Sequence, residues 1–393
     1  MYNNKNLKFY YDDPFRTVNE SLKKKFQKDY RICSNCLFDT SIYGISFDSK
    51  EVCSFCNGYK NKKIIKNIDL QKSIQLIKKN TKSKYDCLVG LSGGVDSSYV
   101  AIKCKELNLK TLLVHFDNGW NTEVASKNIE IIQKYTGFDL ITHVVDWEEF
   151  KILQLSFLKA GLTNFEAPSD HGIFASMYNY ALKEKIKYVI TGVNSATEFM
   201  ETNNDDERLK FWHGYLYHDL HHLKSINKIF SKKNELKTFP MISIFKRKYL
   251  EMLGKIKIFN ILDYINYSKD IAIEELKKIG WKEYQNKHYE SVITRFHQSF
   301  ILPVKFGLDK RMWHLSSLIW SKQIKRSKAL EIIKENICNE KILVQDYYFF
   351  LKKFNFNQNE FKLLLTNENK LYSDYPNRYW LINSMINLRK IFS

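Results

Sequence analysis

Proline, arginine and long apolar runs are scarce in this chain of 393 residues. No apolar run is long enough to cross a bilayer as a helix, so we expect no membrane-spanning segment and no membrane partner. Only 9 of the 62 basic residues are arginine, the residue enriched at specific phosphate and base contacts. The formal net charge of +19 is therefore mostly lysine spread over the chain, and it indicates a nucleic-acid partner only weakly.

Two further absences concern the compartment. The first residues, M-Y-N-N-K-N, lack the apolar core of a secretory signal peptide, which predicts a cytoplasmic protein. The seven cysteines are an odd number, and this argues against a disulfide framework. The hydrophobic fraction of 44% and the aromatic fraction of 15% are typical of a globular protein, and the length allows one to three domains.

The P-loop pattern G-x-x-x-x-G-K-[ST] is also absent, but another glycine-containing turn is present. An apolar run from Cys87 to Leu91 predicts a buried parallel strand, and the string S-G-G-V-D-S-S at 92–98 follows it. An apolar segment with helical spacing comes next. A strand, a tight turn and a helix start together predict an anion site, because backbone N–H groups converge there and the helix dipole favours negative charge.

Each residue type in this turn suits phosphate binding. Gly93 and Gly94 allow a close approach of phosphate to the backbone, and the hydroxyls of Ser92, Ser97 and Ser98 add donors. A carboxylate such as that of Asp96 can hold Mg²⁺ against the phosphates. The string resembles the pyrophosphate loop of the ATP pyrophosphatases, which cleave ATP to AMP and pyrophosphate.

Four apolar runs alternate with segments of helical spacing. We expect strands at 85–91, 111–116, 140–145 and 188–191, and helices at 97–107, 122–136, 147–160 and 170–185. This alternation predicts an α/β fold, a parallel sheet with helices on both faces. Ligands bind such sheets at the carboxyl ends of the strands, so the site should include His115, Asp117 and Gly192. His115 and Asp117 also suit a second interpretation, loop capping.

Four of the cysteines form two close pairs near the start of the chain, Cys33-x-x-Cys36 and Cys53-x-x-Cys56. This spacing predicts a four-thiolate zinc ribbon, in which the zinc is structural because no coordination position stays open. Zinc would supply much of the folding energy of so small a module. An iron–sulfur cluster remains an alternative.

Residues 280–311 form a second dense block of ionisable and aromatic side chains. The charged members are Lys287, His288, Glu290, Arg295, Lys305, Lys310 and Arg311. They can be surface charges on two helices, but a reaction that releases pyrophosphate also needs cations to neutralise it. Lys305 and the pair Lys310-Arg311 are the candidates for that role. Residues 312–393 predict further helices and contain no motif that we can assign.

These motifs together resemble those of the N-acetyl sugar amidotransferases, pyrophosphate-loop enzymes of bacterial surface-polysaccharide, lipopolysaccharide and flagellin-glycan pathways. The resemblance covers about residues 31–330. The double C-x-x-C and S-G-G-V-D-S-S-Y are shared with other pyrophosphate-loop enzymes. The strings that narrow the choice are T-G-V-N-S-A-T-E, K-H-Y-E-S-V-I-T-R-F and P-V-K-F-G-L-D-K-R.

The resemblance implies an adenine nucleotide α-hydrolase-like fold and an ATP-dependent, AMP-forming ligase. ATP would adenylate the carbonyl oxygen of an acetamido group on a nucleotide sugar or nonulosonic acid, and ammonia would then displace AMP to give an acetamidino group. The implied ATP-binding residues are Leu91, Ser92, Gly93, Gly94, Val95, Asp96, Ser97, Ser98, His115, Asp117 and Gly192. The implied catalytic residues are Asp96 with Mg²⁺, Lys305, Lys310 and Arg311 at the pyrophosphate, and Lys287, His288 or Glu290 at the substrate and the incoming ammonia.

The source of ammonia predicts a partner. The residue directly after Met1 is not a cysteine, so an N-terminal-nucleophile glutaminase is not indicated. No Gly-x-Cys-x-Gly elbow is present either, and we therefore expect a separate glutaminase subunit. Relatives in the family are thought to work with subunits that look like the glutaminase and the barrel of imidazole glycerol phosphate synthase.

Two other functions stay open at this point. A tRNA-modifying enzyme, either a thiolase or a lysidine-type ligase, would share the pyrophosphate loop and would account for the net charge. A thiolase usually needs a reactive cysteine beyond the zinc set, and Cys87 and Cys104 lie in patterns that predict burial. A non-catalytic zinc-ribbon protein would leave the loop unexplained.

The motifs divide the chain into four parts. We expect an extension at 1–30, a zinc ribbon at 31–60, a pyrophosphate-loop nucleotide-binding domain at 61–260, and a helical C-terminal region at 261–393 that completes the active site.

Overall fold

The computed structural model describes most of the chain. The described residues are 13–22, 30–40, 42, 45–61, 70–79, 83–194, 197, 219–231, 236–265, 267–284, 289–378, 380, 381 and 384. Among them, no helix has both the length and the apolar character needed to span a membrane.

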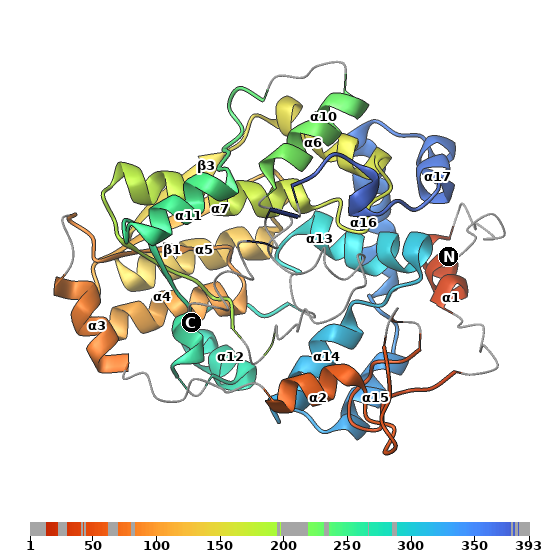
Figure 1. Cartoon of the computed structure of the whole chain (residues 1–393), viewed down its shortest axis with the longest axis horizontal. Helices are drawn as coiled ribbons and strands as arrows, with labels where there is room; N and C mark the ends of the chain where they lie inside the picture. Colours follow the sequence, from red (N-terminus) through yellow and green to blue (C-terminus); the bar gives the residue numbers. More distant parts are fainter. Residues whose placement is uncertain are drawn as a thin grey trace.

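A five-stranded parallel sheet forms the centre of the larger half of the molecule (Figure 1). The strands lie in the order β3-β2-β1-β4-β5. Their bounds are β1 Cys87–Gly90, β2 Thr111–Asp117, β3 Asp139–Val144, β4 Tyr188–Ile190 and β5 Lys257–Phe259. The predicted parallel sheet is confirmed, and the order places β1 next to both β2 and β4. The carboxyl end of β1 is therefore the point where the connections reverse direction, which is where open α/β sheets bind ligands.

Helices cover both faces of the sheet because the strands of its centre are apolar on both sides. Cys87 and Val89 face a core that includes α3 Leu70–Lys79, α4 Val95–Glu106, α5 Glu123–Thr136 and α12 Lys269–Lys278. Leu88, between them, faces the core shared with α7 Ala167–Lys183 and α11 Ile244–Met252. Alternate side chains of a strand point to opposite faces, so a continuous apolar run at β1 requires a cover on each side.

Helices after residue 289 build a second body that lies beside the sheet (Figure 1). They are α13 Val292–Phe296, the π-helix η4 His297–Phe306, α14 Arg311–Trp320, α15 Arg326–Lys334, α16 Glu340–Phe354, α17 Gln358–Thr366 and the short 3-10 turn η5 Tyr372–Asp374. The aromatic side chains of α13, η4, α16, α17 and η5 share one core with α1 Pro14–Leu22, α6 Trp147–Lys159 and α10 Leu220–Phe230. The predicted helical C-terminal region is confirmed.

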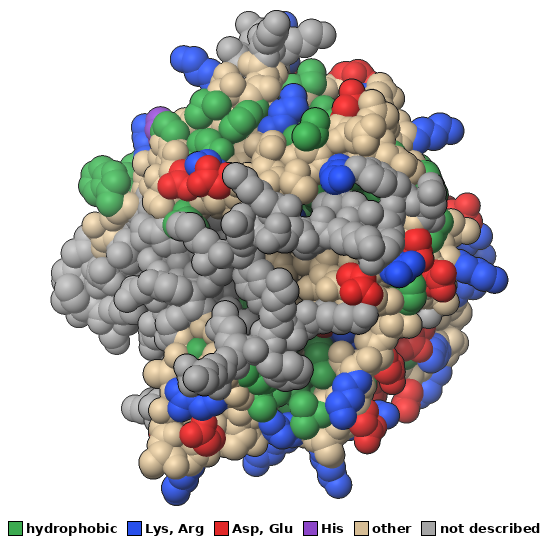
Figure 2. Space-filling view, turned by 90° about the vertical axis from the view of Figure 1, so that its right-hand side faces the viewer, with side chains coloured by type: hydrophobic (Ala, Val, Ile, Leu, Met, Phe, Trp, Pro, Cys, Tyr) green, Lys and Arg blue, Asp and Glu red, His purple; other side chains and the backbone are tan. Residues whose placement is uncertain are grey.

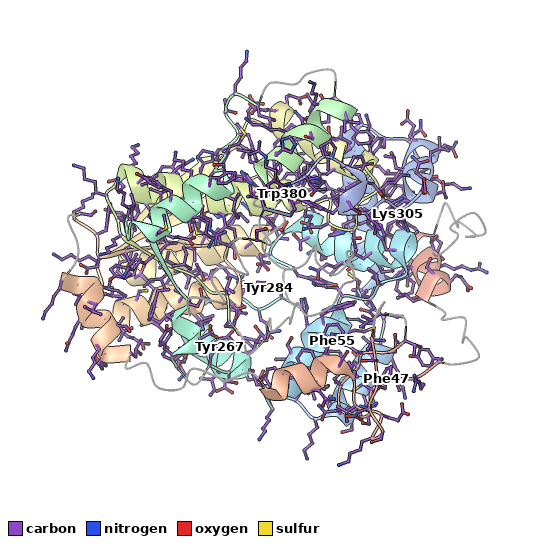
Figure 3. The ribbon with its side chains drawn as sticks, in the orientation of Figure 1. Phe47, Phe55, Tyr267, Tyr284, Lys305 and Trp380 are labelled. Atoms are coloured by element: carbon purple, nitrogen blue, oxygen red, sulfur yellow. The ribbon has the colours of Figure 1, made fainter. Side chains whose placement is uncertain are left out.

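The cysteine-rich module packs against this second body. Phe38 contacts the rings of Phe55, Trp313 and Trp320, and the guanidinium of Arg326 donates to the carbonyl oxygens of Cys33 and Cys36. Figure 3 shows Phe55 beside α14, and Phe47 at the outer side of the module. The module ends in α2 Ser54–Asn61. Its position therefore depends on α14 and α15, which follow it by more than 250 residues in sequence.

One segment differs from the sequence prediction. Residues 199–260 do not stand out as structured in the sequence, but the described part contains α10, α11 and the edge strand β5, followed by the 3-10 turn η3 Ile261–Asp263. β5 has three residues and none of them is buried, so it lacks the apolar run that marks the strands of the sheet centre. The face in Figure 2 shows lysine and arginine side chains interspersed with aspartate and glutamate on the described residues, so the excess of lysine forms no continuous basic surface there.

Candidate functional site

The loop Ser92–Gly94 joins β1 to α4 in a conformation that only glycine allows. Gly93 has a φ of +80°, and a Cβ atom at this position would lie 2.5 Å from the carbonyl oxygen of Ala125. The carbonyl oxygen of Gly93 accepts from the indole N–H of Trp281 at 3.2 Å and from the amide of Asn128 at 3.3 Å. Hydrogen bonds from α5 and from the segment after α12 therefore hold the turn in place.

The backbone donors at the start of α4 meet hydroxyl groups of the chain itself. The N–H of Ser92 donates to Ser97 Oγ at 3.1 Å, and the N–H of Gly94 donates to Ser92 Oγ at 3.2 Å. The N–H of Val95 donates to the hydroxyl of Tyr284 at 2.9 Å. Burial raises the pKa of Tyr284, and the nearby charge of Glu290 raises it further, so this hydroxyl is neutral and keeps its proton. Converging N–H groups at a helix start form an anion site, and the Tyr284 hydroxyl meets one of these N–H groups here.

Asp96 occupies the first turn of α4, and its carboxylate reaches the cavity described below. Its Oδ1 accepts a hydrogen bond from the hydroxyl of Tyr267, which lies just before α12 (Figure 3). A Cβ atom at Gly192 would lie 3.0 Å from the backbone carbonyl carbon of Asp96, so the loop after β4 also touches this turn. The loops after β1 and β4 thus meet at Asp96, as the strand order requires.

The carboxyl-terminal part of β2 contributes a neutral imidazole. His115 Nδ1 donates to the carbonyl oxygen of Leu91 at 2.8 Å, and Nε2 accepts from the amide of Asn121 at 2.9 Å. Burial lowers the pKa of His115, which agrees with the neutral form that these two partners require. Asp117 accepts from the N–H of Gly119 at 2.8 Å and therefore caps its own loop.

A cavity of about 430 Å³ lies at this edge of the sheet and is lined by three groups of residues. The strand ends and loops supply Leu91, Ser92, Gly94, Val95, Asp96, Ser97, His115, Asn118, Asn121, Thr191 and Gly192. The start of α7 supplies Glu166, Ser169, Asp170 and Ile173. The later part of the chain supplies Lys269, Tyr284, Glu290, Ser291, Thr294, Gln298 and Lys310. The expected nucleotide residues Gly93, Ser98 and Asp117 stand next to these but not in the lining.

Residues 290–292 pair through their backbone with residues 120–122, which follow β2. Asn121 and Ser291 form an antiparallel bridge, the N–H of Thr122 donates to the carbonyl oxygen of Glu290 at 2.9 Å, and that of Val292 donates to Trp120. This pairing brings Glu290 Oε1 to 3.4 Å from Ser92 Oγ. Glu290 and Lys310, both expected at the site, therefore line the cavity, while Lys287 and His288 lie outside the described residues.

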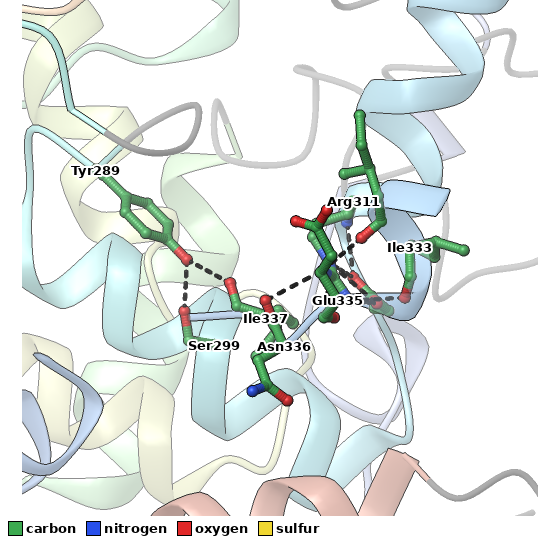
Figure 4. Close-up of polar contacts among 9 residues, drawn as sticks. Tyr289, Ser299, Arg311, Ile333, Glu335, Asn336 and Ile337 are labelled. Atoms are coloured by element: carbon green, nitrogen blue, oxygen red, sulfur yellow. Dashed lines mark hydrogen bonds and ion pairs between the residues drawn. The ribbon is translucent and has the colours of Figure 1, made fainter. Parts of the chain in front are cut away.

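Lys305 and Arg311 take other partners than the pyrophosphate expected for them. Lys305 is 1% exposed, and its ammonium group donates to the carbonyl oxygens of Leu364 and Asn367, where α17 ends. Figure 3 shows it among the C-terminal helices, away from Tyr284. Arg311 binds Asp309 with two nitrogens and the carbonyl oxygens that end α15 (Figure 4). Neither residue lines the cavity, because carbonyl oxygens at a helix end hold each of them elsewhere.

The position of Arg311 predicts a structural effect. Replacing Arg311 with lysine should lower the free energy of unfolding by about 2–4 kcal/mol, since a lysine cannot satisfy both Asp309 and the carbonyl oxygens of Ile332 and Glu335. Chemical denaturation measures this loss. Lys328→Arg is the control, because Lys328 and Glu331 are exposed, and it should change stability by less than about 0.5 kcal/mol. An Arg311→Lys protein as stable as the wild type would contradict the assignment.

Lys305 predicts a dependence of stability on pH. Burial lowers the pKa of Lys305 to about 8 from its ordinary value of 10.5. Between pH 8 and 10.5 the unfolded chain therefore binds more protons here than the folded chain, and this group makes the protein more stable as pH rises. The wild type should gain about 3 kcal/mol over Lys305→Met between pH 7 and pH 11. Thermal unfolding of both proteins across this pH range tests the prediction. A stability difference between them that does not change with pH is the contrary result.

Several residues of the site were missed in the sequence. Tyr284, Glu166 and Thr294 line the cavity, and Tyr267 donates to Asp96 beside it. Long-range packing brings them there, and nothing in their local pattern sets them apart. A weak signal exists for Glu166, an acidic residue in front of the Ala167-Pro168 that begins α7.

The four paired cysteines form one compact cluster, as the spacing predicts. All four are buried, and their sulfur atoms lie within 4.8 Å of one another. Cys33 Sγ and Cys56 Sγ are 3.7 Å apart, as are those of Cys36 and Cys53. A tetrahedral ion with metal–sulfur bonds of about 2.3 Å sets its sulfurs about 3.8 Å apart, so the residues fit a single ion. A four-iron cluster interposes iron and sulfide atoms between the thiolates and needs a wider opening.

Comparison with known proteins gives one family match. Residues 290–389 match the family model described as "LPS biosynthesis protein WbpG-like, C-terminal domain". No curated protein sequence matches the chain. This match agrees with the resemblance to enzymes of surface-glycan pathways.

The chain is also similar to several solved structures. The NH3-dependent NAD synthetase from Campylobacter jejuni is 16% identical and aligns over 56% of this chain and 99% of its own, with a TM-score of 0.27. The NMN synthetase from Francisella tularensis is 13% identical over 66% and 98%, with a TM-score of 0.28. The U34-tRNA thiolase NcsA from Methanococcus maripaludis is 14% identical over 77% and 81%, with a TM-score of 0.31. At these scores the likeness carries no argument, and the fold assignment rests on the strand order.

The family match and the cavity meet in one segment. Glu290, Ser291, Thr294, Gln298 and Lys310 line the cavity, and all of them fall within residues 290–389. Residues 290–389 are therefore similar to the C-terminal domain of WbpG-like LPS biosynthesis proteins.

Proposed function

We propose that the chain is an ATP-dependent, AMP-forming carbon–nitrogen ligase that converts an acetamido group of a surface-glycan sugar into an acetamidino group. One observation carries this proposal. A single cavity is lined on one side by the Ser92–Ser97 turn and on the other by the segment that matches a WbpG-like domain of LPS biosynthesis. The first side has the chemistry for splitting ATP, and the second connects the same cavity to surface-glycan synthesis.

In the first step, the turn and the start of α4 would hold the phosphates of ATP. The N–H groups of Gly94 and Val95 and the hydroxyls of Ser92 and Ser97 would face the departing pyrophosphate. Asp96 would hold Mg²⁺, which neutralises charge on the phosphates when it is bound. Lys310 would add a positive charge from the C-terminal side. The carbonyl oxygen of the acetamido group would attack the α-phosphorus and the bond to pyrophosphate would break. The amide nitrogen would lose its proton to solvent, which leaves a neutral imidate.

In the second step, ammonia would attack the activated carbon and AMP would leave. An amide oxygen is a poor leaving group, and its adenylation removes this obstacle. Ammonia would come from a separate glutaminase subunit through a channel subunit. The described residues contain no cysteine suited to a glutaminase, because all seven cysteines are buried and four of them form the cluster.

The same burial argues against a thiolase. Cys87 and Cys104 are fully buried beneath α4, and a hydrogen bond with Cys87 together with burial raises the pKa of Cys104. A thiol with a raised pKa yields little of the reactive thiolate. Cys338 is buried in the C-terminal core, and burial raises its pKa as well. For the four-cysteine cluster we propose zinc, since the sulfur spacing suits one tetrahedral ion and no coordination position stays open.

The decisive experiment measures AMP and pyrophosphate release by the purified protein with ATP, Mg²⁺ and ammonium. A panel of UDP-linked N-acetyl sugars and nonulosonic acids is compared with bulk tRNA. Release that depends on an acetamido sugar, with an amidine product in the mass spectrum, is the expected result. AMP formation that responds to tRNA and to none of the sugars would refute the proposal.

A further inference from the structure

A buried carboxylate–imidazole pair lies in the wall of the cavity opposite the pyrophosphate loop. Glu166 Oε2 is 2.9 Å from His297 Nδ1, and Glu166 Oε1 accepts a hydrogen bond from the hydroxyl of Thr294 at 2.6 Å. His297 Nε2 is 2.9 Å from the carbonyl oxygen of Thr163. A carbonyl oxygen can only accept, so Nε2 carries a proton. The remaining hydrogen of the pair lies between His297 Nδ1 and Glu166 Oε2.

The pair faces the cavity through its carboxylate alone. Glu166 and Thr294 line the cavity, whereas His297 lies behind them and is 1% exposed. The ring of Phe165 stands edge-on to the imidazole at 4.8 Å and completes its apolar surroundings. An imidazole with both nitrogens bonded has one orientation, so it fixes the carboxylate that it touches.

The usual structural role of such a carboxylate is not in use here. Glu166 is the residue at the start of α7, where a side chain normally accepts from the first backbone N–H groups of a helix. It makes no such capping bond. Its oxygens turn to the cavity wall instead. The carboxylate is thus held by side chains of the C-terminal body and not by its own helix.

The proposed second step requires a proton acceptor in this cavity. The nucleophile is neutral ammonia, but the lining carries the carboxyl groups of Asp96, Glu166, Asp170 and Glu290 and favours the ammonium ion. After the nitrogen attacks, it must also lose a proton before AMP departs. Asp96 and Glu290 stand at the pyrophosphate loop, so a group on the opposite wall is needed for the incoming nitrogen.

We propose that Glu166 is this proton acceptor and that His297 is its positioning residue. The inference rests on the proposed function and assigns one step of it. Glu166 takes a proton from ammonium, the freed electron pair of nitrogen forms the bond to the activated carbon, and a second proton passes from that nitrogen to the imidate nitrogen. The carbon–oxygen bond then breaks, AMP takes its electron pair, and the product leaves as the amidinium ion. His297 takes no proton in this step; both of its nitrogens are already bonded, and it holds the carboxylate in place while Glu166 gains the proton.

The test separates the two steps in one protein. Sugar-dependent exchange of pyrophosphate into ATP reports adenylation, and AMP formation that depends on ammonium reports the second step. Glu166→Gln keeps the size of the side chain and should leave the exchange within about threefold of the wild type. The ammonium-dependent rate should fall by about a hundredfold or more, the usual contribution of a positioned base. Glu149→Gln on α6, whose carboxylate binds Thr238 outside the cavity, is the matched control and should change neither rate.

Hydroxylamine and pH distinguish a base from a structural residue. Hydroxylamine is mostly unprotonated at neutral pH, so with this nucleophile Glu166→Gln should lose less than about tenfold. With ammonium, the rate of the variant should follow the fraction of free ammonia and rise about tenfold per pH unit. Equal losses with both nucleophiles, equal losses in exchange and ammonium use, or an unchanged ammonium rate would each overturn the proposal. Absence of sugar-dependent exchange in the wild type would instead overturn the proposed function, and with it this assignment.

To separate chemistry from folding, Glu166→Asp and His297→Asn are measured alongside Glu166→Gln, with thermal unfolding of each. A folded Glu166→Asp protein should recover part of the ammonium-dependent rate. His297→Asn should lower the same rate by about tenfold and leave the exchange intact. If the exchange rate and the melting temperature fell together across these variants, the pair would have a structural role only, and the proposal would be overturned.

Discussion

Replacing Asp96 with asparagine should lower sugar-dependent pyrophosphate release by about a thousandfold. Removing one group that stabilises charge in a transition state costs about 3–4 kcal/mol, and the loss of a metal ligand adds to this. Asparagine keeps an Oδ1 atom, so the hydrogen bond from the Tyr267 hydroxyl and the first turn of α4 should persist. The measurement is the rate of pyrophosphate release at saturating ATP and varied Mg²⁺.

Tyr267→Phe is the matched control. It removes the donor to Asp96 but keeps the carboxylate, and it should cost about tenfold or less, the value of a lost hydrogen bond to a charged group. Both variants should unfold within about 1 kcal/mol of the wild type. Asp96→Asn with more than about a tenth of the wild-type rate would refute the assigned role. A loss shared equally by the two variants would indicate that the contact, and not the charge, matters.

The pyrophosphate turn could be predicted because it is local. Gly93 and Gly94, the serines and Asp96 stand next to one another in sequence, and the turn between a buried strand and a helix fixes where they point. The four cysteines could be predicted for a similar reason, since each pair is local and the spacing of the two pairs is typical of a four-thiolate site. The edge strand β5 could not, because none of its three residues is buried, whereas the equally short β4 is buried throughout.

The opposite wall of the cavity could not be predicted from the sequence. Glu166 and His297 are separated by 131 residues and meet only when α13 and η4 dock against the start of α7. Lys305 and Arg311 show the converse. Their charge is visible in the sequence, but packing decides where each side chain points. Both side chains point to the end of a helix, where backbone carbonyl oxygens lack helical partners. A basic residue near a motif is therefore a weaker indication of a functional site than a residue inside the motif.

The cysteine cluster couples the start of the chain to the cavity through α14. The indole N–H of Trp320, at the end of α14, donates to Cys56 Sγ at 3.0 Å, and Trp313 packs on Phe38. Lys310 stands at the other end of α14, where it lines the cavity. The module therefore supports the helix that carries a cavity residue, although no cysteine of the cluster lines the cavity.

Removal of the ion should unfold the module and disturb this helix. We expect one zinc per chain by elemental analysis, and Cys36→Ser should lose it. Structural four-ligand zinc sites contribute about 10–16 kcal/mol to the folding of isolated modules, more than packing on α14 and α15 replaces. The variant should be cut by proteases within residues 30–61, show altered Trp320 fluorescence, and lose at least about tenfold in the sugar-dependent rate as Lys310 is displaced.

Cys338→Ala is the control, because Cys338 is buried outside the cluster. It should keep the zinc and the protease resistance and lose only about 1–2 kcal/mol from the small cavity that it creates. Full zinc content and unchanged proteolysis in Cys36→Ser would contradict the metal site. Sulfurs 3.7 Å apart leave room for one ion and not for a cluster. The visible absorption of an iron–sulfur cluster in the wild type would therefore contradict the zinc assignment.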